Sequence, residues 1–336
     1  MSLRLQRSNI RRIEGTAATL AVFLLAATLP VVGAAQSPQP LPAVNLGFTS
    51  FLDGGPPAGP GFYFQQYFQY LYADEFMNKN GNEVPLLDNL HALVSLSQGI
   101  YQSDQSIPLI GGKWGFDLIL PLVYLDVDPA PGSPLNSYGV GLGDLLVGPY
   151  IQWDPIMGDK GPIFMHRIEL QNLLPVGGYD DDKVLNPGAN FYHFNPYWAA
   201  TWFVMPRWKL SWRLHYLWNA KNNDPLKRIT GPPTGPWPAD TQAGQAIHLN
   251  FATSFEAIPK QLHVGINGYY LKQITNTKVD GNSIAGTREQ VLGIGPGAVW
   301  HFSPDNHLFA NFYFETAAEN RPEGKIRLNL RWTHHF

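Results

Sequence analysis

The stretch WKLSWRLHYLWN, residues 208–219, alternates between apolar and polar side chains along its length. Trp208, Trp212, Tyr216 and Trp218 share one parity with two leucines, whereas the other parity is mostly charged or polar. Successive side chains of a strand point to opposite faces, so the segment predicts a strand with one aromatic and one polar face. The core of a soluble sandwich and the wall of a membrane barrel would both suit such a strand.

The amino terminus has the order of a secretory signal peptide. Four arginines precede an uncharged apolar run at residues 16–35, which ends in small residues. This run is about long enough to span a bilayer, so a membrane anchor is the alternative. Pro30 and the small residues that begin at Gly33 suit a cleavage site, and they favour a signal peptide at residues 1–35. We therefore expect an exported chain.

The composition excludes several classes of function. Without residues 1–35 the chain keeps 19 of its 23 basic and 25 of its 26 acidic side chains, a net charge of −6. That balance gives no electrostatic reason to expect nucleic-acid binding. Cysteine is absent, which excludes disulfides and thiolate metal sites, and no cofactor is predicted. Charged residues make up 15% of the chain, whereas about 25% is usual.

The alternation of residues 208–219 recurs along the chain, and no helical period competes with it over a long window. Counting the alternating runs gives about twelve strands. The predicted strands are residues 62–72, 89–101, 113–127, 138–153, 163–174, 191–205, 208–219, 242–257, 262–275, 289–302, 307–317 and 324–336.

The connections between these strands alternate in length, most clearly from the fifth strand onward. Residues 206–207, 259–261 and 303–306 make short turns, whereas 175–190 and 220–241 are long. Short periplasmic turns, long outer loops and an even strand number are typical of outer-membrane barrels. A Greek-key sandwich has no reason to order its loops in this way. Residues 61–336 therefore predict an all-β fold, a transmembrane antiparallel up-and-down β-barrel of about 12 strands.

The dimensions of the strand at 208–219 agree with a bilayer. Ten residues from Trp208 to Trp218 extend about 33 Å, which projects to about 25 Å when the strand is tilted. That is the height of the apolar band of such barrels, whose edges carry aromatic residues. We expect lipid-interface aromatics at Trp208, Trp212, Tyr216, Trp218, Trp332 and Phe336.

Two features depart from regular strands. Pro121, Pro149, Pro196 and Pro296 fall inside predicted strands, where each removes a hydrogen-bond donor, so bulges or kinks are expected there. The Pro/Gly-rich residues 36–60 precede the first strand and are either a linker or a plug that enters the barrel.

Several segments resemble one family of exported barrels. They are PPAGPGFYFQQYFQYLYADEF (56–76), GVGLGDLLVGPYIQW (139–153), LPVGGYD (174–180), GYYLKQITN (268–276) and RWTHHF (331–336). The family is associated with the meta-cleavage pathway of phenol degradation, and the segments span nearly all of the mature chain in the expected order. The resemblance implies an outer-membrane channel or transporter for aromatic and other hydrophobic compounds in a Gram-negative bacterium. Phe336 also resembles the terminal aromatic of the signal that the barrel-assembly machinery reads.

The polar parity of the strands supplies candidate lumen-lining residues. One interpretation is a lining that tunes what passes, and the other is a set of charges that balance one another and fill the barrel. A turn near Arg321 would place Glu315 opposite Arg327 as a cross-strand ion pair. The candidates are Asp144, Arg167, Glu169, Gln171, Arg213, His215, His248, Glu256, His263, Glu315, Arg327 and Arg331.

The predicted function is passive uptake of small hydrophobic or aromatic compounds by a barrel whose other partners are outer-membrane lipids. The alternatives are a general polar-solute porin and a structural or adhesion barrel. A lipid hydrolase is disfavoured because His248, Asn250 and Ser254 share the lumen parity, whereas catalysis on lipid needs a triad on the outer wall. The carboxylates of residues 180–182 match no calcium-loop spacing and predict a solvated loop.

Overall fold

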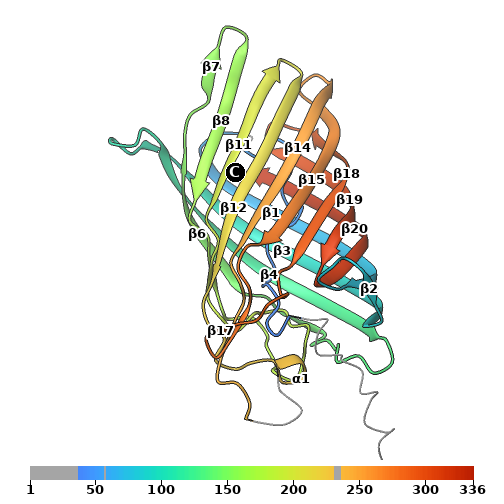
Figure 1. Ribbon diagram of the computed structural model, residues 1–336. Coiled ribbons are helices and arrows are strands. Elements are labelled where there is room, and N and C mark those ends of the chain that lie inside the picture. Colours follow the sequence, from blue (N-terminus) through green and yellow to red (C-terminus); the bar gives the residue numbers. More distant parts are fainter. Residues whose placement is uncertain (1–36, 57, 231–235) are drawn as a thin grey trace, which may run out of the picture. The chain divides into compact units, whose positions relative to one another are not determined.

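The computed structural model describes residues 37–56, 58–230 and 236–336. The signal peptide expected at residues 1–35 lies outside the described residues. The described chain is built around one antiparallel sheet that closes on itself, because the last long strand, β20, pairs with the first, β1, from Tyr63↔His335 to Met77↔Arg321 (Figure 1).

The barrel has twelve strands, as predicted, and three of them are split into two pieces. They are β1 (Gly61–Met77), β3 (Leu87–Ser106), β4 (Lys113–Pro129), β5 (Val140–Leu142) with β6 (Leu145–Gln152), β8 (Gly161–Glu169) with β9 (Asn172–Leu174), β10 (His193–Phe194) with β11 (Tyr197–Met205), β12 (Trp208–Asn219), β14 (Ala246–Ile258), β15 (Leu262–Gln273), β18 (Gln290–His301), β19 (Asn306–Glu319) and β20 (Arg321–His335).

The two ends of the barrel differ in the length of their connections. At the short-turn end the strands are joined by residues 107–112, 153–160, 206–207, 259–261 and 302–305, and β7 (Ile156–Gly158) extends the hairpin with β8. The long-loop end carries residues 78–86, 130–139, 175–192, 220–230, 236–245 and 274–289, together with the single-residue turn at Asn320. Its loops contain β2 (Glu83–Val84), α1 (Lys227–Thr230) and a small sheet of β13 (Thr241–Gln242), β16 (Lys278–Val279) and β17 (Asn282–Ser283).

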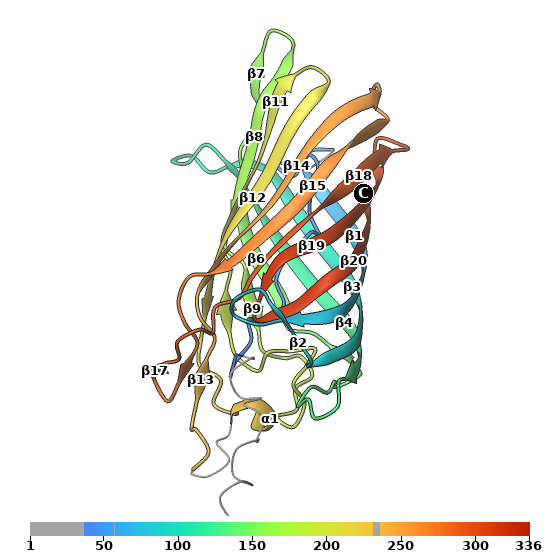
Figure 2. The same ribbon diagram turned by 45° about the vertical axis from the view of Figure 1, so that its right-hand side comes forward.

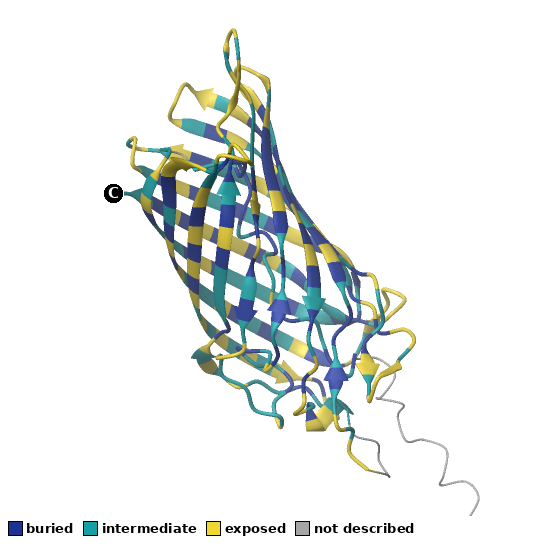
Figure 3. Cartoon of the chain, turned by 90° about the vertical axis from the view of Figure 1, so that its left-hand side faces the viewer, coloured by how far each residue is buried: buried dark blue, intermediate teal, exposed yellow. Residues whose placement is uncertain are grey.

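The outer face of the barrel is apolar. On β12 every odd-numbered residue is buried and every even-numbered one is exposed or half-exposed, and Figure 3 shows the same banding along the other strands. Trp208 is 47% exposed on this outer face. A continuous exposed apolar face of this kind suits hydrocarbon rather than water, so the strands span a membrane. Among the described residues, no helix is long and apolar enough to cross a membrane.

Three of the four strand prolines leave the register of the sheet unchanged. Pro149 and Pro296 lie in ladders that keep a single register, and β10 and β11 keep the same register with β12 on either side of Pro196. No register shift therefore marks these three prolines in the described strands, although the strand is interrupted at Asn195 and Pro196, between β10 and β11. Each proline removes only its own hydrogen-bond donor, and the pairs on both sides hold the ladder in place.

At Pro121 the expected irregularity is present, but it lies in the neighbouring strand. β5 and β6 pair with β4 in registers that differ by one residue, on either side of Gly143 and Asp144. Residues 138–153, predicted as one strand, are consequently broken at this bulge.

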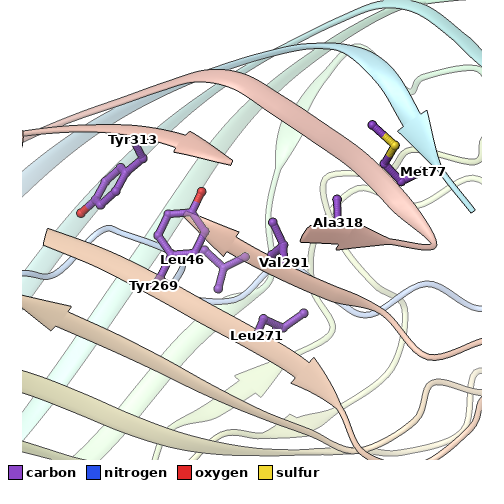
Figure 4. Close-up of a cluster of buried hydrophobic side chains, with 7 residues drawn as sticks. All are labelled: Leu46, Met77, Tyr269, Leu271, Val291, Tyr313 and Ala318. Atoms are coloured by element: carbon purple, nitrogen blue, oxygen red, sulfur yellow. The ribbon is translucent and has the colours of Figure 1, made fainter. Parts of the chain in front are cut away.

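The segment that precedes β1, described at residues 37–56 and 58–60, runs through the inside of the barrel (Figure 2). Leu46 of this segment packs against Tyr269 of β15 and Tyr313 of β19 in a buried cluster (Figure 4). The Tyr313 hydroxyl donates a 2.9 Å hydrogen bond to the carbonyl oxygen of Gly47. The interior is therefore filled by the segment as well as by inward-facing side chains.

Candidate functional site: the barrel interior

The segment at residues 37–60 runs from the long-loop end to the short-turn end. At its start, the Gln39 side-chain oxygen accepts a 2.8 Å hydrogen bond from the Thr241 hydroxyl in a long loop. Further along, the Gly54 amide donates to Thr201 Oγ1 on β11 at 2.9 Å. Near its end, the Ala58 amide donates to the hydroxyl of Tyr63 at 3.3 Å, close to the start of β1.

One charged group fixes the middle of the segment. Asp53 accepts hydrogen bonds from Nε and Nη2 of Arg213 on β12, both 2.7 Å long, and both side chains are 5% exposed. Bidentate pairs of this kind are among the stronger hydrogen-bonded contacts in proteins. Asp53 therefore neutralises a buried lumen arginine and holds the segment against one side of the barrel.

The segment leaves a large cavity beside it. The cavity has a volume of about 1360 Å³, and its lining includes Leu185 in a long loop and Pro304 in a short turn, so it extends towards both ends of the barrel. One wall is apolar. Its side chains come from β1, β3, β4, β6 and β9 and comprise Leu71, Ala92, Val94, Leu96, Ile100, Ile119, Pro121, Val123, Leu125, Leu146 and Leu173.

The apolar wall was not predicted from the sequence. In β4 the run LILPLVYL, residues 118–125, is apolar at both parities, so alternation assigns neither parity to the lumen. Leu118, Leu120 and Leu122 are exposed on the outer face, whereas Ile119 and Val123 line the cavity. A continuous apolar run is the mark of a strand with apolar surroundings on both faces, and that signal was available in the sequence.

The predicted lumen residues are mostly buried. Eleven of the twelve are less than a tenth exposed, and Glu256 is half-buried, paired with Lys209 at 3.0 Å. Those that also line the cavity are Asp144, Arg167, Gln171, Arg213, His263, Arg327 and Arg331.

Two predicted residues form an ion pair in a register that differs from the expectation. Arg327 Nη2 donates to Glu315 Oε1 at 2.8 Å, yet Tyr313, not Glu315, lies directly opposite Arg327. The predicted register is wrong because the turn centres on Asn320 rather than Arg321, which moves the partner by two residues. Two residues along a strand share a face, so the diagonal pair still forms.

Asp144 was expected within a regular strand, and the structure places it elsewhere. It lies in the bulge between β5 and β6, where its carboxylate accepts hydrogen bonds from the backbone amides of Gly177 at 3.1 Å and Ala189 at 2.9 Å. His193 Nε2 is 3.6 Å from the same carboxylate. The side chain therefore attaches the long loop at residues 175–192 to the barrel wall.

Three other predicted lumen residues, His215, His248 and Glu169, contact neighbouring side chains inside the barrel. The rings of His215 and His248 stack with centroids 4.0 Å apart and an interplanar angle of 13°. Glu169 accepts a hydrogen bond from the Tyr197 hydroxyl. No metal-ligating group of three or more residues involves these side chains in the part of the chain that is described; the one such group is Asp180, Asp181 and Asp182 in a loop.

The predicted interface aromatics lie on the outer parity of their strands. Trp208, Tyr216, Trp332 and Phe336 are exposed, and Trp212 and Trp218 are half-exposed. The indole nitrogen of Trp208 donates to Thr253 Oγ1 at 2.7 Å. An aromatic ring with a polar handle is typical of the membrane–water boundary.

A family model described as "Putative MetA-pathway of phenol degradation" matches residues 73–332. The chain belongs to this family. That result confirms the resemblance stated from the sequence. No curated protein matches the chain in sequence.

The fold is that of a solved structure. The chain is similar to the COG4313 outer membrane channel from Pseudomonas putida F1, with a TM-score of 0.71, 17% identity and coverage of 88% of this chain and 100% of that one. It also matches the TodX monoaromatic hydrocarbon channel deltaS2 mutant, with a TM-score of 0.47, 8% identity and coverage of 91% and 98%. The first similarity identifies the fold as that of an outer-membrane channel.

Proposed function

We propose that this protein is a passive channel of the Gram-negative outer membrane for small hydrophobic or aromatic compounds. The observation that carries the proposal is the 1360 Å³ cavity inside the barrel, one wall of which is apolar. A barrel that conducted only ions and sugars would have no reason to line its lumen with leucine and valine, because pores for polar solutes are lined with polar side chains.

The segment at residues 37–60 occupies part of the lumen, so the path that remains for a solute is narrow. Asp53 and Gly54 bind it to the barrel wall, and Gln39 binds it to a long loop at one end of the barrel. Leu41 and Val44 of the segment line the cavity together with the apolar wall. We propose that the segment acts as a plug that restricts the lumen, so that a solute moves between it and strands β3 and β4.

A polar-solute porin is the second candidate, and the arginines of the lumen favour it. Arg167, Arg213 and Arg327 all line the cavity, and a wet pore would use such a charged lining to select ions. Conductance in planar bilayers separates the candidates. Large, steady ionic currents through the unmodified protein would favour the porin.

The proposed role is conduction rather than catalysis or adhesion, and it includes two surface partners. Lipid would cover the exposed apolar face of the strands. Phe336 is 75% exposed at the end of β20, which is where an assembly factor could bind the last strand.

The decisive experiment is uptake into proteoliposomes. Purified protein is reconstituted, and entry of benzyl alcohol is compared with entry of a sugar of similar mass. The hydrophobic channel predicts faster entry of benzyl alcohol than into empty liposomes and little sugar entry. Equal rates for benzyl alcohol with and without the protein would contradict it, and so would rapid sugar entry.

A further inference from the structure

Arg331 is a charged side chain of the lumen without the acidic partner that Arg213 and Arg327 have. Arg331 of β20 is 6% exposed and lines the cavity. Within the described residues it takes part in no ion pair, and its Nε is buried without a hydrogen-bond partner. By contrast, Arg213 is paired with Asp53 and Arg327 with Glu315.

The sheet around Arg331 contains no acid. Directly opposite it lie Tyr67 on β1 and Phe309 on β19. The flanking lumen positions on its own strand are Asn329 and Thr333, and those on the two neighbouring strands are glutamine, histidine and asparagine. In the described part of the chain Arg167 also takes part in no ion pair, but Glu169 lies two residues away on the same face. Arg331 is therefore the buried guanidinium with the least local compensation.

Aromatic rings hold the guanidinium in place. Its Cζ lies 3.6 Å from the centroid of the Phe309 ring and 5.8 Å from that of Tyr67. Cation–π contacts of this kind stabilise an arginine, yet they leave its buried Nε–H without a hydrogen-bond partner. A buried charge without a counter-ion is costly, and an anion that entered the cavity would offset that cost.

The apolar wall begins beside this group. Tyr67 pairs with Leu96 of β3, and Leu96 pairs with Pro121 of β4. Leu96 is thus two strands from Arg331, about 10 Å along the sheet, and both line the same cavity. A solute with a planar ring and one carboxylate could place its ring on this wall while its carboxylate reached the arginine.

Resting on the proposed function, we propose that Arg331 is an anion-binding residue of the channel and that the solutes it favours are aromatic carboxylates rather than neutral hydrocarbons. A guanidinium presents parallel N–H donors that match the two oxygens of a carboxylate. The neighbouring leucine and proline side chains supply the apolar contact. The arginine binds and positions the solute and takes part in no chemical step.

The test measures binding of a matched pair of probes to the full barrel in detergent. Titrations followed by ¹⁹F NMR compare 4-fluorobenzoate with the neutral 4-fluorobenzyl alcohol. In the unmodified protein, 4-fluorobenzoate is expected to bind more tightly. Arg331→Met should weaken 4-fluorobenzoate about tenfold, since hydrogen bonds to charged groups contribute on that scale, and should leave the alcohol unchanged.

Arg207→Met is the matched control. Arg207 also covers a phenylalanine ring, with its Cζ 4.6 Å from the centroid of Phe255, but it is exposed and lies outside the cavity. It should leave both affinities unchanged. Arg331→Lys keeps the charge without the planar fork and should give an intermediate affinity. Heat-modifiable migration on gels checks that each variant is folded.

The inference is overturned if the unmodified protein binds both probes equally, if Arg331→Met retains the benzoate affinity, or if Arg207→Met loses it equally. Should Arg331→Met not fold, the probe preference of the unmodified protein and Arg331→Lys decide the matter. Failure of the proposed function looks different. Neither probe would then enter proteoliposomes, although Arg331-dependent binding of 4-fluorobenzoate would persist.

Discussion

Asp53 and Arg213 are 160 residues apart in the sequence and share two 2.7 Å hydrogen bonds inside the barrel. One partner belongs to the segment that precedes the barrel and the other to the wall. Because the pair is buried, removing the carboxylate leaves an uncompensated charge, at a cost of about 3 kcal/mol. The position of the whole segment is therefore sensitive to one side chain.

Asp53→Asn is expected to loosen the segment and to increase the frequency of high-conductance openings in single-channel recordings. The neutral amide cannot balance the charge of Arg213. Asp154→Asn is the control, because Asp154 pairs with Lys113 at 2.6 Å on the exposed short-turn end. Equal opening frequencies in Asp53→Asn and the unmodified protein would show that the pair does not retain the segment.

Gly54→Ala is expected to displace the segment by steric overlap. A Cβ atom at Gly54 would lie 2.4 Å from both the Met165 carbonyl oxygen and the Thr201 amide nitrogen, and backbone atoms cannot move aside easily. Overpacking of this kind costs about 1–3 kcal/mol. Limited proteolysis should cut the segment faster in the variant.

Gly99→Ala is the matched control for that experiment, because an added Cβ there has no atom within 4 Å. Its proteolysis rate should equal that of the unmodified protein. Slow, unchanged cleavage of Gly54→Ala would contradict the close packing of the segment against β8 and β11.

Val123→Gln is expected to slow entry of neutral aromatic solutes several-fold in proteoliposomes. The amide places polar atoms on the apolar wall, and desolvating an amide without a partner costs about 1–3 kcal/mol. Val127→Gln is the control, since Val127 shares the parity and strand of Val123 but lies outside the cavity lining. Equal effects of the two substitutions would exclude the wall from the path.

Tyr179 in the long loop at residues 175–192 gives a prediction for alkaline pH. Burial raises the pKa of its phenol to about 12, and its hydroxyl donates to the Asp224 carbonyl at 2.6 Å. Because the folded pKa lies above the usual value of about 10, the phenol favours the folded loop at neutral pH and loses that effect as pH rises from 10 to 12.

The measurement is the phenolate absorbance at 295 nm of the unmodified protein minus that of Tyr179→Phe. The difference should titrate with a midpoint near pH 12. A midpoint near pH 10 would mean that the hydroxyl is not held by the neighbouring loop.

The barrel could be predicted from the sequence because lipid and lumen impose a strict two-residue period. Trp208 and Arg213 illustrate it, since each lies on the parity that alternation assigns. The apolar wall could not be predicted in the same way, because Ile119 and Leu120 are both apolar and either could face the lumen.

The contacts of the interior segment were beyond sequence reasoning for another reason. Asp53 has no periodic neighbours, and its partner Arg213 is fixed by the closed ring rather than by spacing in the chain. The pair of Glu315 and Arg327 could be predicted in part. Strand parity brought them to one face, but a one-residue change in the turn centre decided which residue lies opposite.

The path of residues 37–60 constrains how the protein is made. Gln39 is hydrogen-bonded at the long-loop end, yet β1 starts at the short-turn end, so the leading part of the chain has to pass through the ring of strands. If β1 and β20 pair last, the barrel closes around a segment that is already inside it. No free chain end then has to be threaded through a finished pore. The path of the segment therefore favours an assembly order in which the seam between β1 and β20 closes after the segment is in place.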